Sequence, residues 1–314
     1  MPDSQPKQNI KWSYMDHWTM LSPRGWVAPQ LGPQYADRFY KQLVALGFEG
    51  VDPFEFRLNG LIQIFGSAKK AQQFAQDRGI ERFVNVFVCF YNDMTHLREQ
   101  HDGIVQAFEA KVKQYEDIKL DNFIVMPATR YWQAEPITDE KIKRMADCWN
   151  RVGKVTKKHG IWLTCHHEFY CGLHHREEID KFYAYTDPEY VGFFLDTAQH
   201  QIAGIDPTDL YVKYHDRVTG FHFKDTHHID TSGDYRTPPD PERDASTTKR
   251  WFWEMGTDKG LVDFPKLMKA LKDLNYQGWV TVEHDKADVA GGNYAESTAR
   301  CKWYIDNVLS KVYA

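Results

Sequence analysis

The chain has 314 residues with a formal net charge of −5, and 42% of them are hydrophobic and 26% charged. These proportions are ordinary for a folded globular protein and allow a sizeable buried core. The length allows one or two domains, and a barrel of this length would form a single domain over residues 1–314. Because the chain is acidic and has no stripe of basic residues, it has little electrostatic affinity for nucleic acid.

The N-terminus and the cysteines indicate a cytoplasmic protein. The opening stretch MPDSQPKQNIKW is polar and lacks the apolar segment of a signal peptide, and no window approaches the roughly 20 apolar residues that span a bilayer. The five cysteines, at positions 89, 148, 165, 171 and 301, include no CxxC pair. Their odd number and scatter argue against a disulfide framework and against a zinc ribbon, so we expect reduced thiols.

Apolar runs rich in β-branched and aromatic residues recur along the chain and predict buried strands. They occupy residues 10–18, 48–56, 82–92, 122–130, 160–169, 191–200, 218–226 and 278–285. Segments with helical periodicity lie between and after them, several closing on glycine or opening on an Asp or Thr that can cap the first turn. These segments are 33–47, 68–79, 139–160, 176–186, 206–216, 263–275 and 296–312.

The alternation of strands and helices predicts a (β/α)₈ TIM barrel, because parallel strands need helical crossovers. An open doubly wound sheet is the alternative, weakened by the absence of a GxGxxG loop after the first strand. The seventh connection, from Thr226 to Gly278, is extended and contains a polar, proline-rich stretch at 231–246. We expect this connection to form a lid or a partner surface.

Polar residues interrupt the last four apolar runs, at the strand ends where such a barrel forms its active site. They are Glu168 with His166 and His167, Asp196 with His200, His222 with Lys224 and Asp225, and Glu283 with His284 and Asp285. Three carboxylates and one imidazole therefore converge from four consecutive strands. This oxygen-rich set favours Mn²⁺, with Mg²⁺ or Co²⁺ as alternatives, in an open octahedral site.

A local zinc site within the stretch TCHHEFYCGLHH is a competing interpretation. The two-residue strand period points Cys165 and His167 to the same face, but Cys171 and His175 fall in the following loop, so this site is disfavoured. We expect the cysteines to fill apolar space and His174 and His175 to form the exposed start of a helix.

The C-terminal half resembles the xylose-isomerase-like TIM barrels, a superfamily of sugar phosphate isomerases and epimerases that includes inosose dehydratases and ketose 3-epimerases. The motifs that carry the resemblance are FFLDTAQHQIAGIDP, VTGFHFKD, MGTDKGLVDFPKLMKAL and YQGWVTVEHD. The N-terminal half matches only in its rhythm of strands and helices. In this superfamily Glu, Asp, His and Glu bind a divalent metal, which implies Glu168, Asp196, His222 and Glu283 as ligands here.

Two departures separate the chain from the subgroups named above. Inosose dehydratases have His-x-His where this chain has His166-His167-Glu168, and ketose epimerases have an Glu-x-x-Asn context that is absent here. The chain most resembles the metal-binding subunit of bacterial C-glycoside deglycosidases, which act on 3-oxo-glucosides together with a small β subunit. This resemblance implies His166 as the base, and either such a partner or a homo-oligomer as the assembly.

The expected activity is a lyase reaction on an oxidised sugar glycoside, in which a base removes the proton next to the carbonyl and the aglycone leaves. The expected catalytic residues are His166, Lys224 and His284, and the expected substrate-binding residues are His17, Trp18, Asp52, Glu55 and His200. A structural role is the open alternative for the residues of the first two strands. An isomerase, epimerase or inosose dehydratase, and an inactive binding subunit, are the alternative functions.

Overall fold

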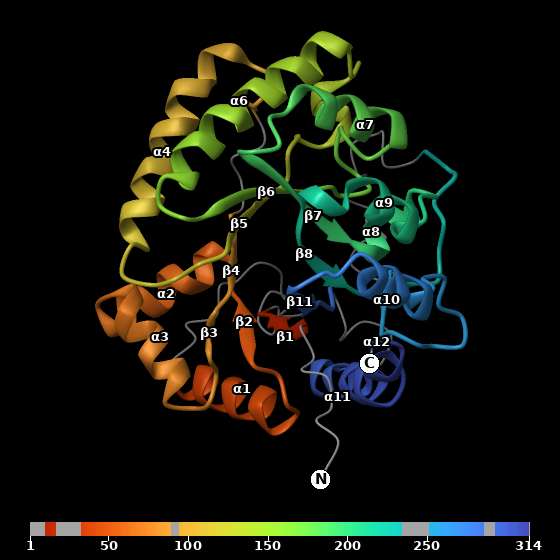
Figure 1. The fold of residues 1–314 in the computed structure, drawn as a ribbon. Helices are drawn as coiled ribbons and strands as arrows, with labels where there is room; N and C mark the ends of the chain where they lie inside the picture. The colour runs from red at the N-terminus through yellow and green to blue at the C-terminus, as the bar shows by residue number, and fades with distance from the viewer. Residues whose placement is uncertain (1–9, 17–32, 89–93, 234–250, 286–292, 314) are drawn as a thin grey trace, which may run out of the picture.

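The computed structural model describes residues 10–16, 33–88, 94–233, 251–285 and 293–313. Its centre is a barrel of parallel strands surrounded by helices (Figure 1). The barrel strands are β1 (Ile10–Met15), β2 (Gly50–Asp52), β3 (Arg82–Phe83), β4 (Asn85–Phe87), β5 (Asn122–Val125), β6 (Trp162–His166), β7 (Val191–Asp196), β8 (Val218–Phe223) and β11 (Gly278–Val282). Each of the eight predicted runs contains one of these strands, or two in the case of 82–92.

The strand order is β3-β2-β1-β11-β8-β7-β6-β5-β4. Strands β3 and β4 are consecutive parts of one strand, interrupted at Val84. Because β3 pairs with β2 and β4 pairs with β5, both in parallel, this interrupted strand closes the barrel. The predicted (β/α)₈ barrel is therefore confirmed, and the open sheet is not found.

The helices cover the outside of the barrel. They are α1 (Pro33–Ala45), α2 (Glu55–Phe65), α3 (Ala68–Gln76), α4 (His101–Gln114), α5 (Tyr131–Ala134), α6 (Asp139–Lys157), α7 (Arg176–Tyr185), α8 (Thr197–Ile202), α9 (Pro207–Tyr214), α10 (Phe264–Asp273), α11 (Tyr294–Tyr304) and α12 (Ser310–Tyr313). The sequence analysis missed two longer helices, α2 and α4, and two short ones, α5 and α8. Neither α2 nor α4 has a side chain that caps its first turn, so the usual start signal is absent there.

The extended seventh connection returns to the barrel mouth. Strand β10 (Phe252–Trp253) pairs antiparallel with β9 (Asp225–Thr226), which follows β8 directly. The connection was predicted to form a lid or a partner surface, and most of its proline-rich stretch, residues 234–246, lies outside the described residues. Its predicted role therefore stays a prediction.

The barrel interior has a polar layer with an apolar layer above it. In the polar layer Asp52 Oδ2 accepts hydrogen bonds from Asn85 Nδ2 at 2.6 Å and from Thr281 Oγ1 at 2.7 Å. The apolar layer consists of Met15, Phe54, Phe87, Ile124 and Phe194. Side chains therefore fill the barrel up to the level at which the polar strand ends begin.

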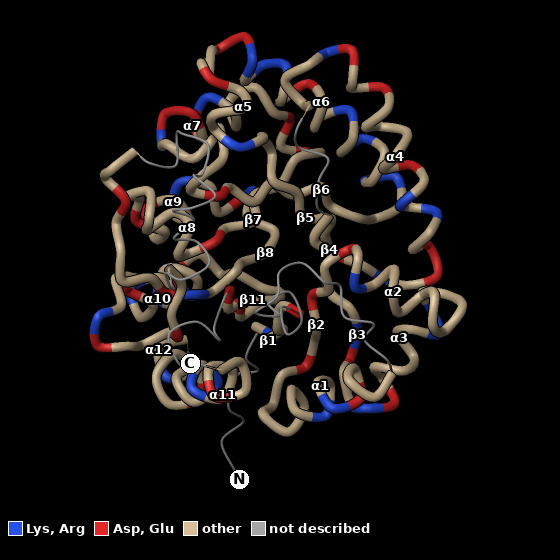
Figure 2. Tube along the Cα trace, turned by 180° about the vertical axis from the view of Figure 1, so that it is seen from behind, with Lys and Arg blue, Asp and Glu red and all other residues tan. Residues whose placement is uncertain are grey.

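Charged residues of both signs are intermixed along the outer helices (Figure 2). Several are paired one helical turn apart, such as Lys143 with Asp139 and Lys181 with Glu177. In the part of the chain that the structure describes, no helix combines the length and the apolar character needed to cross a membrane.

Candidate metal centre

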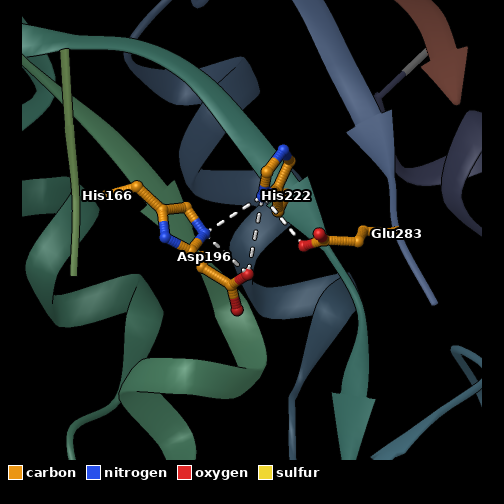
Figure 3. A group of neighbouring side chains, drawn as sticks. All are labelled: His166, Asp196, His222 and Glu283. Carbon is orange, nitrogen blue, oxygen red and sulfur yellow. Dashed lines mark hydrogen bonds and ion pairs between the residues drawn. The ribbon is translucent and has the colours of Figure 1, made fainter. Parts of the chain in front are cut away.

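Four buried side chains from neighbouring strands meet at the carboxyl ends of the barrel. His166 ends β6, Asp196 ends β7, His222 lies in β8 and Glu283 follows β11. One donor atom from each residue can be chosen so that all four atoms lie within 4.8 Å of one another. Figure 3 shows the four side chains pointing toward a common centre. Each side chain comes from a different rigid strand, so the cluster is held in place by the barrel itself.

The donor atoms of this cluster are close enough that a positive charge is needed between them. His166 Nε2 lies 3.0 Å from His222 Nδ1 and 3.1 Å from Asp196 Oδ2. His222 Nδ1 also lies 2.9 Å from Glu283 Oε2. Two imidazole nitrogens that face each other between two buried carboxylates need a proton or a metal ion among them. Two imidazoles and two carboxylates are also an ordinary donor set for a divalent metal, so the residues fit such an ion.

The charges around the cluster also favour a cation at its centre. Burial tends to lower the pKa of His166, but the carboxylates of Glu168 and Asp196 outweigh burial and raise this pKa to about 10. Burial also opposes the charge on His222, and Glu283 and Asp196 again raise the pKa. The carboxylates therefore favour a positive charge between these imidazoles, which a proton or a bound cation can supply.

A buried lysine lies beside the cluster. Lys224 Nζ is 3.0 Å from Asp196 Oδ2, 2.8 Å from Glu283 Oε2 and 2.6 Å from Asp285 Oδ2. Burial acts to lower the pKa of Lys224, but these carboxylates raise it well above its usual value. Lys224 is therefore a charged hydrogen-bond donor at the site, and its expected catalytic role stays a prediction.

Glu168 is not one of the four clustered residues but contacts one of them, His166. The sequence analysis expects Glu168 as a ligand and His166 as the base, whereas the structure places His166 in the cluster and Glu168 Oε1 3.1 Å from His166 Nδ1. Strand β6 ends at His166, and the backbone leaves the strand before Glu168. The two-residue period puts both side chains on the inner face, but it cannot tell which of them lies level with Asp196 and His222.

Gln199 connects Glu168 to the cluster and was missed by the sequence analysis. Gln199 Nε2 donates a hydrogen bond to Glu168 Oε2, and the Gln199 backbone N–H donates to Asp196 Oδ1 at 2.8 Å. Gln199 Oε1 accepts from the Phe169 N–H at 3.1 Å. The signal was present in the motif DTAQ, which begins with Asp196. Gln199 fixes the orientation of the Glu168 carboxylate.

An apolar floor lies beneath the imidazoles. The ring of Phe194 lies edge-on to His222 with the centroids 4.7 Å apart, and the ring of Phe87 lies edge-on to His166 at 5.3 Å. Both phenylalanines belong to the apolar layer of the barrel interior. This floor keeps water from reaching the cluster from below and limits the rotation of the rings.

Two predicted site residues lie on the outer side of the barrel. His284 Nδ1 is 3.2 Å from Tyr14 Oη, and His284 Nε2 is 3.1 Å from Cys301 Sγ of α11. His200 lies in α8 beside Phe193, with ring centroids 5.5 Å apart. The structure therefore separates both side chains from the cluster. His284 is next to Glu283, and adjacent strand residues face opposite sides. His200 lies in the helix after β7, where its ring packs against Phe193.

The residues expected from the first two strands are placed elsewhere or not described. Asp52 belongs to the polar layer inside the barrel, where burial raises its pKa to about 6. Glu55 forms a buried ion pair with Lys111, which links α2 to α4. His17 and Trp18 lie outside the described residues.

The disfavoured zinc site of Cys165, His167, Cys171 and His175 finds no support among the described residues. Neither of the two groups able to hold a metal contains a cysteine. His167 faces the helices, with Nδ1 2.7 Å from the Leu173 carbonyl oxygen and Nε2 3.2 Å from Tyr183 Oη. His175 does precede α7, but His174 is buried rather than exposed.

The burial of His200 predicts a dependence of stability on acid. Burial lowers the pKa of His200 from 6.5 to about 3, so the unfolded chain binds this proton first as the pH falls. The free energy of unfolding should therefore decrease between pH 6.5 and 3, by at most about 1.4 kcal/mol per pH unit from this residue. In urea unfolding from pH 7 to pH 4, His200→Gln should show a shallower decrease than the unsubstituted protein. Parallel curves would contradict the assignment.

The fold and cluster define a class: a (β/α)₈ barrel with a histidine and carboxylate cluster, able to hold a metal, at the carboxyl ends of its strands. The chain belongs to the xylose isomerase-like TIM barrel family, whose model matches residues 40–303.

Inosose dehydratases are among the relatives of this chain. The one from Bacillus velezensis is 26% identical over 96% of this chain and 98% of its own length. The one from Lacticaseibacillus casei is 28% identical, but the match spans 55% of this chain and only 56% of that enzyme.

Solved structures share the fold at low identity. A sugar phosphate isomerase/epimerase from Parabacteroides distasonis has a TM-score of 0.71 at 16% identity, covering 97% of this chain and 96% of that one. The IOLI protein, solved with a bound zinc atom, has a TM-score of 0.70 at 16% identity, covering 97% and 99%. A probable 3-DHS dehydratase from Bacillus anthracis has a TM-score of 0.70 at 11% identity, covering 95% and 99%.

Proposed function

We propose that the protein is a metal-dependent lyase that acts on a ketone of a ring-shaped sugar or cyclitol, removing the proton next to the carbonyl and expelling a leaving group one carbon further on. The observation that carries this proposal is the cluster of His166, Asp196, His222 and Glu283 with a charged lysine beside it. The inosose dehydratase relatives support the same type of reaction.

In this proposal the four clustered residues hold the ion, and Glu168 is the base. A bound divalent metal supplies a Lewis acid that stabilises negative charge on the carbonyl oxygen of the substrate. Glu168 is only 7% exposed and lies 3.1 Å from His166 of the cluster, which makes its carboxylate the candidate base for a carbonyl bound there. Gln199 holds the carboxylate in place by donating to its second oxygen.

Lys224 is the proposed hydrogen-bond or proton donor. Its ammonium group, surrounded by three carboxylates, can donate a hydrogen bond to the carbonyl oxygen or a proton to the leaving group. The apolar floor beneath the histidines keeps bulk water from quenching the carbanion from below. With water as the leaving group, the balanced reaction is a dehydration.

A second candidate is release of an aromatic aglycone from a 3-oxo-glycoside, as in a C-glycoside deglycosidase. It is favoured by a group of aromatic rings next to Glu168: Trp251 lies 5.3 Å from Phe169 and 5.3 Å from His228 between centroids. Flat rings of this kind can stack against an aromatic leaving group. This candidate includes a small β subunit as partner, with a homo-oligomer as the alternative.

The test is to incubate the Mn²⁺-loaded protein in D₂O with an inosose and, separately, with a 3-oxo-glycoside of an aromatic aglycone. Dehydration of the inosose supports the first candidate, and aglycone release supports the second. Deuterium incorporation without loss of any group would indicate an isomerase or epimerase and overturn the lyase proposal, as would no reaction with either compound.

A further inference from the structure

We propose that Asp52 is a positioning residue for the metal: one water enclosed in the barrel accepts the Nε2–H of His222 and donates to Asp52 Oδ1. This inference rests on the metal site of the proposed function. Three buried side-chain atoms carry it, namely His222 Nε2, Asp52 Oδ1 and Asn122 Oδ1. Within the described ranges of the chain, none of these atoms has a hydrogen-bond partner.

The His222 ring points one nitrogen at the metal cluster and the other away from it (Figure 3). Nδ1 lies 2.9 Å from Glu283 Oε2 and 3.0 Å from His166 Nε2, so Nδ1 is the atom placed to bind a metal. When Nδ1 binds a metal, Nε2 carries the ring proton and becomes a hydrogen-bond donor. A metal-binding histidine usually donates that proton to a carboxylate, a backbone carbonyl or a water.

Thr281 connects Asp52 to His222. Thr281 and His222 are strand partners in the pairing of β11 with β8, so their side chains lie at one level of the barrel interior. Thr281 Oγ1 donates to Asp52 Oδ2 at 2.7 Å, and Asn85 Nδ2 donates to the same oxygen at 2.6 Å. Both neighbours therefore use Oδ2, and Oδ1 is the carboxylate oxygen left to accept from another donor.

Asn122 brings a second acceptor into the same polar layer. Its Nδ2 lies 2.7 Å from Asn85 Oδ1 and 3.4 Å from the carbonyl oxygen of Thr219, three residues before His222 in the chain. These contacts use the amide NH₂ group, so Oδ1 is the remaining polar atom of the side chain. One water can accept from the Nε2–H and donate to both oxygens, and three hydrogen bonds are usual for an enclosed water.

The surroundings of the His222 ring favour a strong hydrogen bond at Nε2. The ring packs against Phe87 and Phe194, with centroids 6.1 Å and 4.7 Å away, so bulk water does not compete there. Burial raises the pKa of Asp52 to about 6, and a positive charge on His222 acts against burial to lower it. Positive charge at the His222 imidazole therefore favours the ionised Asp52 carboxylate.

The test is Asp52→Asn in the full-length protein. Because Thr281 and Asn85 both donate to the Oδ2 position, the amide oxygen of asparagine should take that position and its NH₂ group the position of Oδ1. A donor would then face His222 Nε2 and favour the ring form with its proton on Nδ1, the atom that must bind the metal. We expect the Mn²⁺ affinity to fall by about 10–100-fold in a protein that still folds.

Thr164→Val is the matched control. It removes a hydroxyl group 2.8 Å from Thr219 Oγ1, elsewhere in the barrel interior. This variant should lower the free energy of unfolding and keep the Mn²⁺ affinity. An equal loss of affinity in both variants would mean that Asp52 acts only through the general stability of the barrel interior, and would overturn the inference.

A second measurement needs no change at Asp52. In NMR spectra of the Zn²⁺-loaded protein with isotope-labelled histidine, His222 should carry its proton on Nε2, and that proton should exchange slowly with solvent. The signal is assigned by its absence in His222→Gln. Rapid exchange of this proton, or unchanged Mn²⁺ affinity in Asp52→Asn, would overturn the role of Asp52 alone. A protein that binds neither Mn²⁺ nor Zn²⁺ would overturn the proposed function as well.

Discussion

The His166→Gln protein is expected to lose metal from the strand-end cluster and, with it, activity. His166 Nε2 points to the centre of the cluster, and a glutamine amide in its place is a weak donor at the wrong distance. Because outer contacts alone typically alter metal affinity by about 10–100-fold, loss of a direct ligand should weaken binding more than about 100-fold. The measurement is Mn²⁺ titration followed by the electron paramagnetic resonance signal of the unbound ion.

His167→Gln is the matched control for this prediction. It makes the same change one residue further on, at a side chain that faces the helices and contacts the Leu173 carbonyl and Tyr183. We expect this control to lower the free energy of unfolding but to retain Mn²⁺ in the folded protein. If His166→Gln also retained Mn²⁺ at its original affinity, the assignment of His166 as a ligand would be wrong.

The barrel was predictable because its signal is repeated. Each apolar run needs a parallel partner, and each partner needs a helical crossover, so errors in one element do not alter the architecture. The two longer helices that were missed, α2 and α4, lack capping side chains, and α2 begins within an apolar run that predicts a strand. Local signals failed there, while packing against the barrel still forms the helices.

Most residues of the site could be predicted from the sequence, but the position of each side chain along the barrel axis could not. Asp196, His222 and Glu283 follow from the strand ends and the resemblance, and the structure brings them together. Side-chain direction excludes His284, which alternates away from Glu283. Whether His166 or Glu168 is level with Asp196 depends on where β6 ends and on the barrel stagger, and neither is fixed by residue types.

Glu168→Gln is expected to retain metal and to lose activity, which is the reverse of what the family ligand set implies for this position. Glutamine preserves the shape of the side chain but cannot accept a proton, so kcat should fall by about 10²–10⁴-fold. The Mn²⁺ affinity should change far less than in His166→Gln, because the four clustered donors remain. Glu177→Gln, exposed in the first turn of α7, is the control and should keep full activity.

The Mn²⁺ affinity of Glu168→Gln decides whether Glu168 is the base or a metal ligand. If Glu168→Gln loses Mn²⁺, then Glu168 is the ligand and His166 the base, as the resemblance implies. If it keeps Mn²⁺ and also stops solvent deuterium exchange into the substrate, the proton transfer itself depends on this carboxylate. Since Gln199 holds the other oxygen of Glu168, Gln199→Met should then lower kcat without changing the metal affinity. A drop in both quantities would mean that Gln199 supports the cluster through Asp196 instead.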